Sequence, residues 1–191
     1  MNMNSNSFKL SDDVINQIKD FPEYRRLTQE QISLIDELIP NEELRERYKE
    51  HGLCGECSQP NTDNDKSDSL PWCQSCNSKH FQQDFNKWTS GNKEIDEFIQ
   101  NFQLNATCHD EVLEWIPYEK FENIEYLAKG GFGIVHKAKW IDGYIEYWNI
   151  SQNKWNRIDN KSIVLKCLNN SQNLTTDFLQ EVCNLLFIIN S

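Results

Sequence analysis

The sequence predicts an α+β protein in which a helical N-terminal module precedes an antiparallel β-sheet. Apolar residues recur at helical spacing through the first half of the chain, two cysteine pairs interrupt that half, and short strand-like runs fill the last part. These changes of pattern divide the chain into a helical segment over residues 1–50, a cysteine-rich module over residues 51–117 and a strand-rich segment over residues 118–191.

The net charge of the chain disfavours negatively charged binding partners. The 191 residues carry a formal net charge of −11, and the excess of acidic residues lies before residue 118. We therefore expect neither a nucleic-acid partner nor an anionic membrane surface. The most apolar run, Leu185–Ile189, is too short to span a bilayer. Because Met1–Ser11 is polar and has no secretory h-region, we expect a cytoplasmic protein with reduced cysteines.

Three helices are predicted before the first cysteine. The first two begin at side chains that can accept hydrogen bonds from the first backbone N–H groups, and the third runs from about Asn41 to Gly52. The expected N-caps are Ser11, and Thr28 with Gln31 as a capping box. Two later helices carry apolar residues at helical spacing, namely Phe81, Phe85 and Trp88, then Ile95, Phe98, Ile99 and Phe102.

Four strand-like runs follow a boundary near Pro117, at residues 124–127, 134–141, 144–150 and 163–168. Asp142-Gly143 predicts a tight hairpin between the second and third runs, since such turns need positive φ. Trp140, Trp148 and Trp155 fit cross-strand packing on an extended ribbon, and the alternative is an aromatic face that binds a partner.

The most specific motif is a pair of CxxC sequences. Cys54 and Cys57 form the first pair, Cys73 and Cys76 the second, and 15 residues separate the pairs. This spacing is typical of a Cys₄ zinc site, in which four thiolates fill the tetrahedral positions and leave none open for a substrate. Metal binding would supply folding free energy that the polar loop between the pairs cannot. The expected cofactor is one structural Zn²⁺.

Two alternatives compete with this interpretation. The four cysteines could be free thiols or two redox pairs, although a redox CxxC would need a βαβ context that is missing. A zinc ribbon that binds nucleic acid is disfavoured by the surrounding acidity. We expect His51 and His80 to be surface residues, and the unpaired cysteines to be small buried side chains: Cys108, Cys167 and Cys183.

A glycine-rich loop lies between the first two strand-like runs. Its residues match three of the four defining positions of G-x-G-x-x-G-x-V, with Gly130, Gly133 and Val135 present and Ala128 in place of the first glycine. Glycines allow backbone N–H groups to approach phosphate oxygens. A glycine-rich hairpin turn without a ligand is the alternative interpretation.

Two later elements support the nucleotide-binding interpretation. Lys166 ends Ile-Val-Leu-Lys, which is similar to the strand whose lysine contacts α and β phosphates. Glu181 follows at an offset suitable for the ion pair that orients such a lysine.

Residues 121–183 therefore resemble the start of a protein kinase N-lobe, closest to tyrosine-kinase-like families. With the Cys₄ module and Trp115–Tyr118, the resemblance extends over most of residues 50–183 to the expanded kinase-like family of mycorrhizal fungi. It implies an incomplete antiparallel N-lobe sheet with the start of helix αC. It also implies that Lys166 binds ATP phosphates, that Glu181 pairs with Lys166, and that a loop covers the nucleotide: Leu127, Ala128, Lys129, Gly130, Gly131, Phe132, Gly133 and Val135.

The catalytic motifs of a kinase are missing from these 191 residues. Neither H-R-D-x-x-x-x-N nor D-F-G follows the glycine loop, so the catalytic base and the Mg²⁺ ligands are not encoded. We therefore expect a kinase fragment that binds ATP weakly and transfers no phosphate by itself. The alternative is a zinc-dependent interaction or regulatory module that binds a protein partner and no nucleotide.

Overall fold

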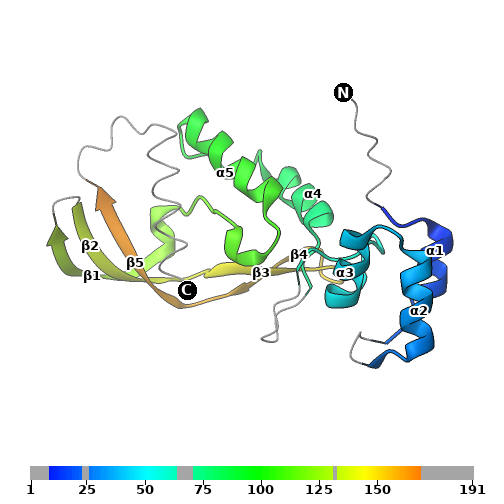
Figure 1. The fold of residues 1–191 in the computed structure, drawn as a ribbon. Coiled ribbons are helices and arrows are strands. Elements are labelled where there is room, and N and C mark those ends of the chain that lie inside the picture. Colours follow the sequence, from blue (N-terminus) through cyan, green and yellow to red (C-terminus); the bar gives the residue numbers. More distant parts are fainter. Residues whose placement is uncertain (1–8, 23–25, 64–70, 131–132, 169–191) are drawn as a thin grey trace. The chain divides into compact units, whose positions relative to one another are not determined.

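The computed structural model describes residues 9–22, 26–63, 71–130 and 133–168 (Figure 1). This part of the chain contains five α-helices and two small antiparallel sheets, which confirms the α+β class. The helices are α1 (Asp12–Ile18), α2 (Gln29–Leu38), α3 (Glu42–His51), α4 (Gln74–Asp84) and α5 (Lys93–Asn105). The strands are β1 (Phe121–Gly130), β2 (Gly133–Trp140), β3 (Tyr144–Asn149), β4 (Lys154–Ile158) and β5 (Lys161–Leu168).

The chain forms two compact units, each discontinuous in sequence. The cysteine unit comprises Met1–Gln83, Gln103–Val112 and Glu146–Asn156. The sheet unit comprises Asp84–Phe102, Leu113–Ile145 and Arg157–Ser191. The division into domains at residues 50 and 117 stays a prediction, because a compact unit need not fold independently.

The first two helices begin where their capping side chains predict, and the structure adds Asn41 as the N-cap of the third. The hydroxyl of Ser11 accepts from Val14 N, and the Asn41 side chain accepts from Leu44 N at 2.9 Å. Thr28 and Gln31 form the expected capping box before α2. Gly52 follows α3 with φ +65°, a conformation that glycine adopts without strain.

Apolar faces of these helices meet in one core of the cysteine unit. Its buried members are Leu10, Ile15, Ile18, Ile35, Ile39, Leu44 and Tyr48. The hydroxyl of Tyr48 donates a hydrogen bond to the Ile18 carbonyl at 3.0 Å, which satisfies the one polar atom that this tyrosine brings into the core.

The two later helices differ in how well the apolar pattern predicts them. Helix α5 contains the whole run from Ile95 to Phe102, as expected. Helix α4 begins at Gln74 and ends at Asp84, so Phe85 and Trp88 lie beyond it, which corrects the predicted extent of this helix. Among the described residues, no helix has both the length and the hydropathy needed to cross a membrane.

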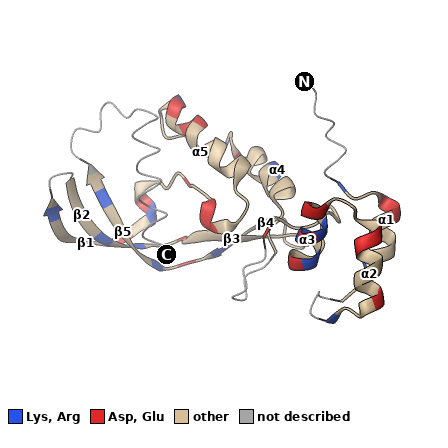
Figure 2. Ribbon diagram, in the orientation of Figure 1, with Lys and Arg blue, Asp and Glu red and all other residues tan. Residues whose placement is uncertain are grey.

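The larger sheet is antiparallel with strand order β1-β2-β5. Strands β2 and β5 pair over eight consecutive positions without a register shift, whereas the β1–β2 pairing has two irregularities. Lysines lie on β2 and β5, and acidic side chains lie on α1, α2 and α5 (Figure 2).

The smaller sheet is the hairpin of β3 and β4. Strand β2 does not pair with β3, because β1 and β5 occupy its two edges, so the hairpin predicted at Asp142-Gly143 is wrong. Gly143 does have the positive φ that the motif predicts, +63°, but Asp142 does not. The hairpin turn lies instead between β3 and β4, a strand that the sequence pattern missed.

A hydrogen-bonded ion pair holds the base of this hairpin in the sheet unit. Arg157 Nη2 lies 2.6 Å from both Glu114 Oε2 and the Gly143 carbonyl oxygen. Glu114 also accepts a hydrogen bond from Ile145 N. Burial raises the pKa of Glu114, and Arg157 opposes that shift.

Candidate metal centre

The first cysteine pair lies in a tight turn that follows α3. Ser58 N donates to the Cys54 carbonyl at 2.9 Å, and Ser58 has φ +55°. Glu56 N donates to Cys54 Sγ at 3.4 Å. The turn therefore brings Cys57 back beside Cys54 and directs a backbone donor at a sulfur atom.

The second cysteine pair lies at the beginning of α4. Cys73 precedes the helix and Cys76 lies in its first turn. The Cys73 carbonyl accepts from Cys76 N at 3.1 Å and from Asn77 N at 2.9 Å, so the helical turn itself places the two thiols on one side.

Backbone pairing brings the two halves together. Leu53 bridges to Pro60 on either side of the first cysteine pair, and Asp63 bridges to Trp72 across the loop that separates the pairs. The Thr62 hydroxyl donates to the Trp72 carbonyl at 3.0 Å. These contacts hold both ends of the loop, so the second pair returns to the first despite the intervening residues.

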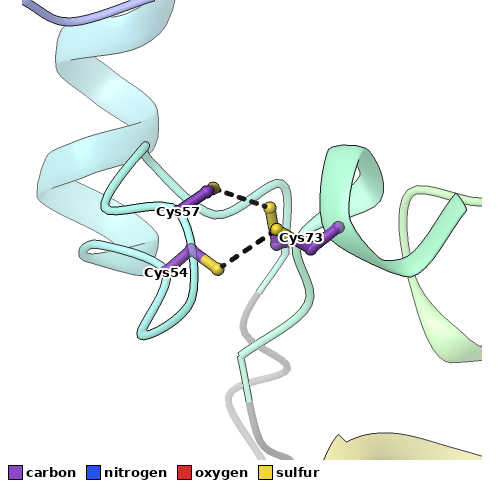
Figure 3. A group of neighbouring side chains, drawn as sticks. Cys54, Cys57 and Cys73 are labelled. Carbon is purple, nitrogen blue, oxygen red and sulfur yellow. Dashed lines mark hydrogen bonds between the residues drawn. The ribbon is translucent and has the colours of Figure 1, made fainter. Parts of the chain in front are cut away.

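The four sulfur atoms form one compact group, with all ligand atoms within 4.8 Å of one another (Figure 3). Cys54 Sγ lies 3.9 Å from Cys76 Sγ, and Cys57 Sγ lies 3.7 Å from Cys73 Sγ. A zinc–sulfur bond of about 2.3 Å gives a tetrahedron with edges of about 3.8 Å. Two of the six sulfur–sulfur separations in the quartet predicted from sequence therefore match the edge of a ZnS₄ tetrahedron, and the other four are at most 4.8 Å.

Burial and mutual hydrogen bonding shift the pKa values of three of these thiols in different directions. Cys54, Cys73 and Cys76 are buried, and Cys57 is half-buried. Hydrogen bonds from Cys54 and Cys73 lower the pKa of Cys57 to about 2. Hydrogen bonding with Cys54 raises the pKa of Cys73, and burial raises that of Cys76 to about 12. Such a cluster binds a divalent cation by releasing its remaining protons.

The two histidines beside the cluster are not among its grouped ligand atoms. His80 is buried, with 7% of its surface exposed, so the prediction of a surface residue is wrong. Its Nε2 lies 2.9 Å from Glu56 Oε2, and its ring stacks on Trp148 at 3.7 Å between centroids. His51 is half-buried, so it is not a surface residue either.

The remaining cysteines also differ from expectation. Cys167, on β5, is exposed rather than buried. Cys108 is half-buried, and burial raises the pKa of its thiol. Cys183 lies outside the described residues.

The predicted nucleotide-binding residues lie on the larger sheet. Leu127, Ala128, Lys129 and Gly130 end β1, Gly133 and Val135 begin β2, and Lys166 lies on β5. Val135 is paired directly with Lys166 and with Ala128. Gly131, Phe132 and Glu181 lie outside the described residues, so the loop tip and the expected ion pair stay predictions.

Comparison with known protein families, with curated proteins and with solved structures finds no match to this chain. The fold and the site define an α+β protein with a candidate Cys₄ metal centre.

Proposed function

We propose that Cys54, Cys57, Cys73 and Cys76 bind one structural Zn²⁺ and that the protein acts as a zinc-dependent module for protein–protein interaction. The compact sulfur group carries this proposal, since its separations of 3.7 and 3.9 Å suit a ZnS₄ tetrahedron. Four thiolates complete the coordination of the ion, so the site has no open position for catalysis.

The surroundings of the centre support an interaction role over nucleic-acid binding. The chain carries a net charge of −11, and this charge would repel phosphate groups. A reducing compartment such as the cytoplasm suits the proposal, because thiolate ligands must stay reduced. The proposed partner is therefore a protein.

Metal analysis of the purified chain tests the proposal. We expect about one equivalent of zinc per chain, its loss in Cys73→Ser, and a clear decrease of thermal stability in that variant. Cys108→Ser is the matched control, because Cys108 lies outside the sulfur group. Less than half an equivalent of zinc in protein never exposed to chelator would contradict the proposal.

A second candidate is the nucleotide half-site implied by the protein kinase resemblance, in which the chain binds ATP weakly. The antiparallel order β1-β2-β5 and the pairing of Val135 with Lys166 favour it, since they put the proposed adenine-covering and phosphate-binding side chains on one face of the sheet. Glycine-loop backbone groups at Gly130 and Gly133 would contact the phosphates. Isothermal titration with ATP separates this candidate from a module that binds no nucleotide.

A further inference from the structure

The β3–β4 hairpin connects two strands of the sheet unit, yet residues 146–156 of it belong to the cysteine unit. Trp148 of β3 and Trp155 of β4 meet across the hairpin with ring centroids 5.1 Å apart. This confirms cross-strand packing for these two tryptophans. Their other faces contact residues that flank the metal centre.

The two tryptophans of the hairpin pack against residues beside the second cysteine pair. The Trp148 ring is nearly parallel to that of His80, at 11°, with 3.7 Å between centroids. Trp155 stacks on Phe81 at 4.3 Å and on Trp72 at 5.9 Å. Trp72 immediately precedes Cys73, and the other two rings belong to α4, which carries Cys76.

Two further contacts connect the hairpin to the first cysteine pair. His80, beneath Trp148, bonds to Glu56, whose own N–H donates to Cys54 Sγ at 3.4 Å. At the hairpin turn, Ile150 Cδ1 lies 3.4 Å from the position that a Cβ on Gly55 would occupy. Gly55 and Glu56 are the two residues between the cysteines of the first pair.

We propose that the β3–β4 hairpin is a third, non-liganding part of the metal centre, which positions both cysteine pairs for Zn²⁺. This inference rests on the proposed zinc site. Mutation of residues that orient metal ligands without binding the metal commonly lowers metal affinity by roughly 10- to 100-fold. Because coupling between two binding events is reciprocal, hairpin docking raises zinc affinity and zinc stabilises hairpin docking to the same extent.

Zinc affinity of the full chain, measured by competition with a chelating dye, tests the proposal. Trp148→Ala should weaken zinc binding about tenfold or more, and Trp148→Tyr, which keeps an aromatic face over His80, should restore most of the affinity. Ile150→Ser removes the contact at the first pair without disturbing the ring stack, and should weaken binding less. Trp115→Ala is the control, since Trp115 is 40% exposed and belongs to the sheet unit.

Cobalt substitution separates positioning from unfolding. Co²⁺ bound by wild type and by Trp148→Ala should give the same tetrahedral thiolate spectrum, because the four ligands are unchanged, while the affinity differs. Affinities within twofold of wild type for both Trp148→Ala and Ile150→Ser would overturn the inference, and so would an equal loss in Trp115→Ala. If the wild-type chain itself did not bind one equivalent of zinc, the proposed function would be wrong. The wild-type titration alone identifies that outcome, so it is distinguished from a failure of the hairpin inference.

Discussion

Val135 of β2 and Lys166 of β5 are direct cross-strand partners in an antiparallel pair. Paired residues project to the same face of a sheet, with Cβ atoms about 4.5–5.5 Å apart. An apolar side chain therefore lies beside a cation on one face of the larger sheet.

We predict that the chain binds ATP with a dissociation constant of about 1 mM. Two or three charge-assisted contacts at roughly 1.5–3 kcal/mol each, offset by ordering of the glycine loop, lead to this weak affinity. Lys166→Ala should weaken it further in calorimetry, and Mg²⁺ should change it little. Lys161→Ala is the control on the opposite face of the same strand. Micromolar binding that Mg²⁺ enhances would refute the half-site, and no binding at several millimolar ATP would favour the interaction module alone.

We also predict that the 191-residue chain transfers no phosphate to itself or to a generic protein acceptor. The sequence holds neither a catalytic-loop base nor the Mg²⁺ ligands that phosphoryl transfer needs. Incubation with radiolabelled ATP measures this directly. Incorporation that survives repurification and disappears in Lys166→Met would show the prediction to be wrong.

Stability should depend on pH through Tyr48 in the alkaline range. Burial raises the pKa of Tyr48 from 10.0 to about 12, so the folded state retains the phenolic proton more tightly than the unfolded state. Its contribution is complete below pH 10 and is lost as the pH rises from 10 towards 12. At neutral pH, Tyr48→Phe should cost about 1 kcal/mol, because the hydrogen bond to Ile18 is removed.

Urea unfolding of the two proteins across this pH range measures the effect. The stability difference between wild type and Tyr48→Phe should shrink above pH 10. Tyr118→Phe is the matched control, because Tyr118 is 69% exposed. A difference that stays constant to pH 12 would count against the role of Tyr48.

Gly143→Ala should be among the most destabilising single substitutions in the sheet unit. Gly143 has φ +63°, and a Cβ there would overlap the Ile158 carbonyl oxygen. We expect a loss of at least about 3 kcal/mol in thermal or urea unfolding. Gly91→Ala isolates the backbone strain, because Gly91 has φ +82° with open space around it, and should cost only about 1–2 kcal/mol. Equal losses in both variants would mean that the close approach to Ile158 relaxes freely.

Local chemistry explains which parts of this structure the sequence could predict. The helix starts at Ser11 and Thr28 depend on a side chain and an N–H group three residues away, and both formed as expected. The four clustered cysteines were also predictable, because the spacing within each pair already places two thiols on one turn.

The parts that were missed depend on contacts between distant segments. Strand β4 has the sequence Lys-Trp-Asn-Arg-Ile, which has no apolar alternation, and only its pairing with β3 makes it a strand. His80 lies in a polar helix and gave no signal of burial, since the covering ring comes from Trp148, far along the chain. The motif Asp142-Gly143 correctly predicted a positive φ at Gly143 but not at Asp142, and no local pattern reveals that β5 pairs with the edge of β2.

The hydrogen bond from Asn160 N to the Ile141 carbonyl, at 3.0 Å, closes the base of the β3–β4 hairpin and continues the β2–β5 ladder by one step. Residues 142–159 therefore form an excursion between β2 and β5, and the number of residues in it does not change the register of the β2–β5 ladder. A variant in which this segment was longer, shorter or absent would still pair Val135 with Lys166. The register of the larger sheet and the length of the hairpin are thus set by different backbone contacts, although one continuous peptide contains both.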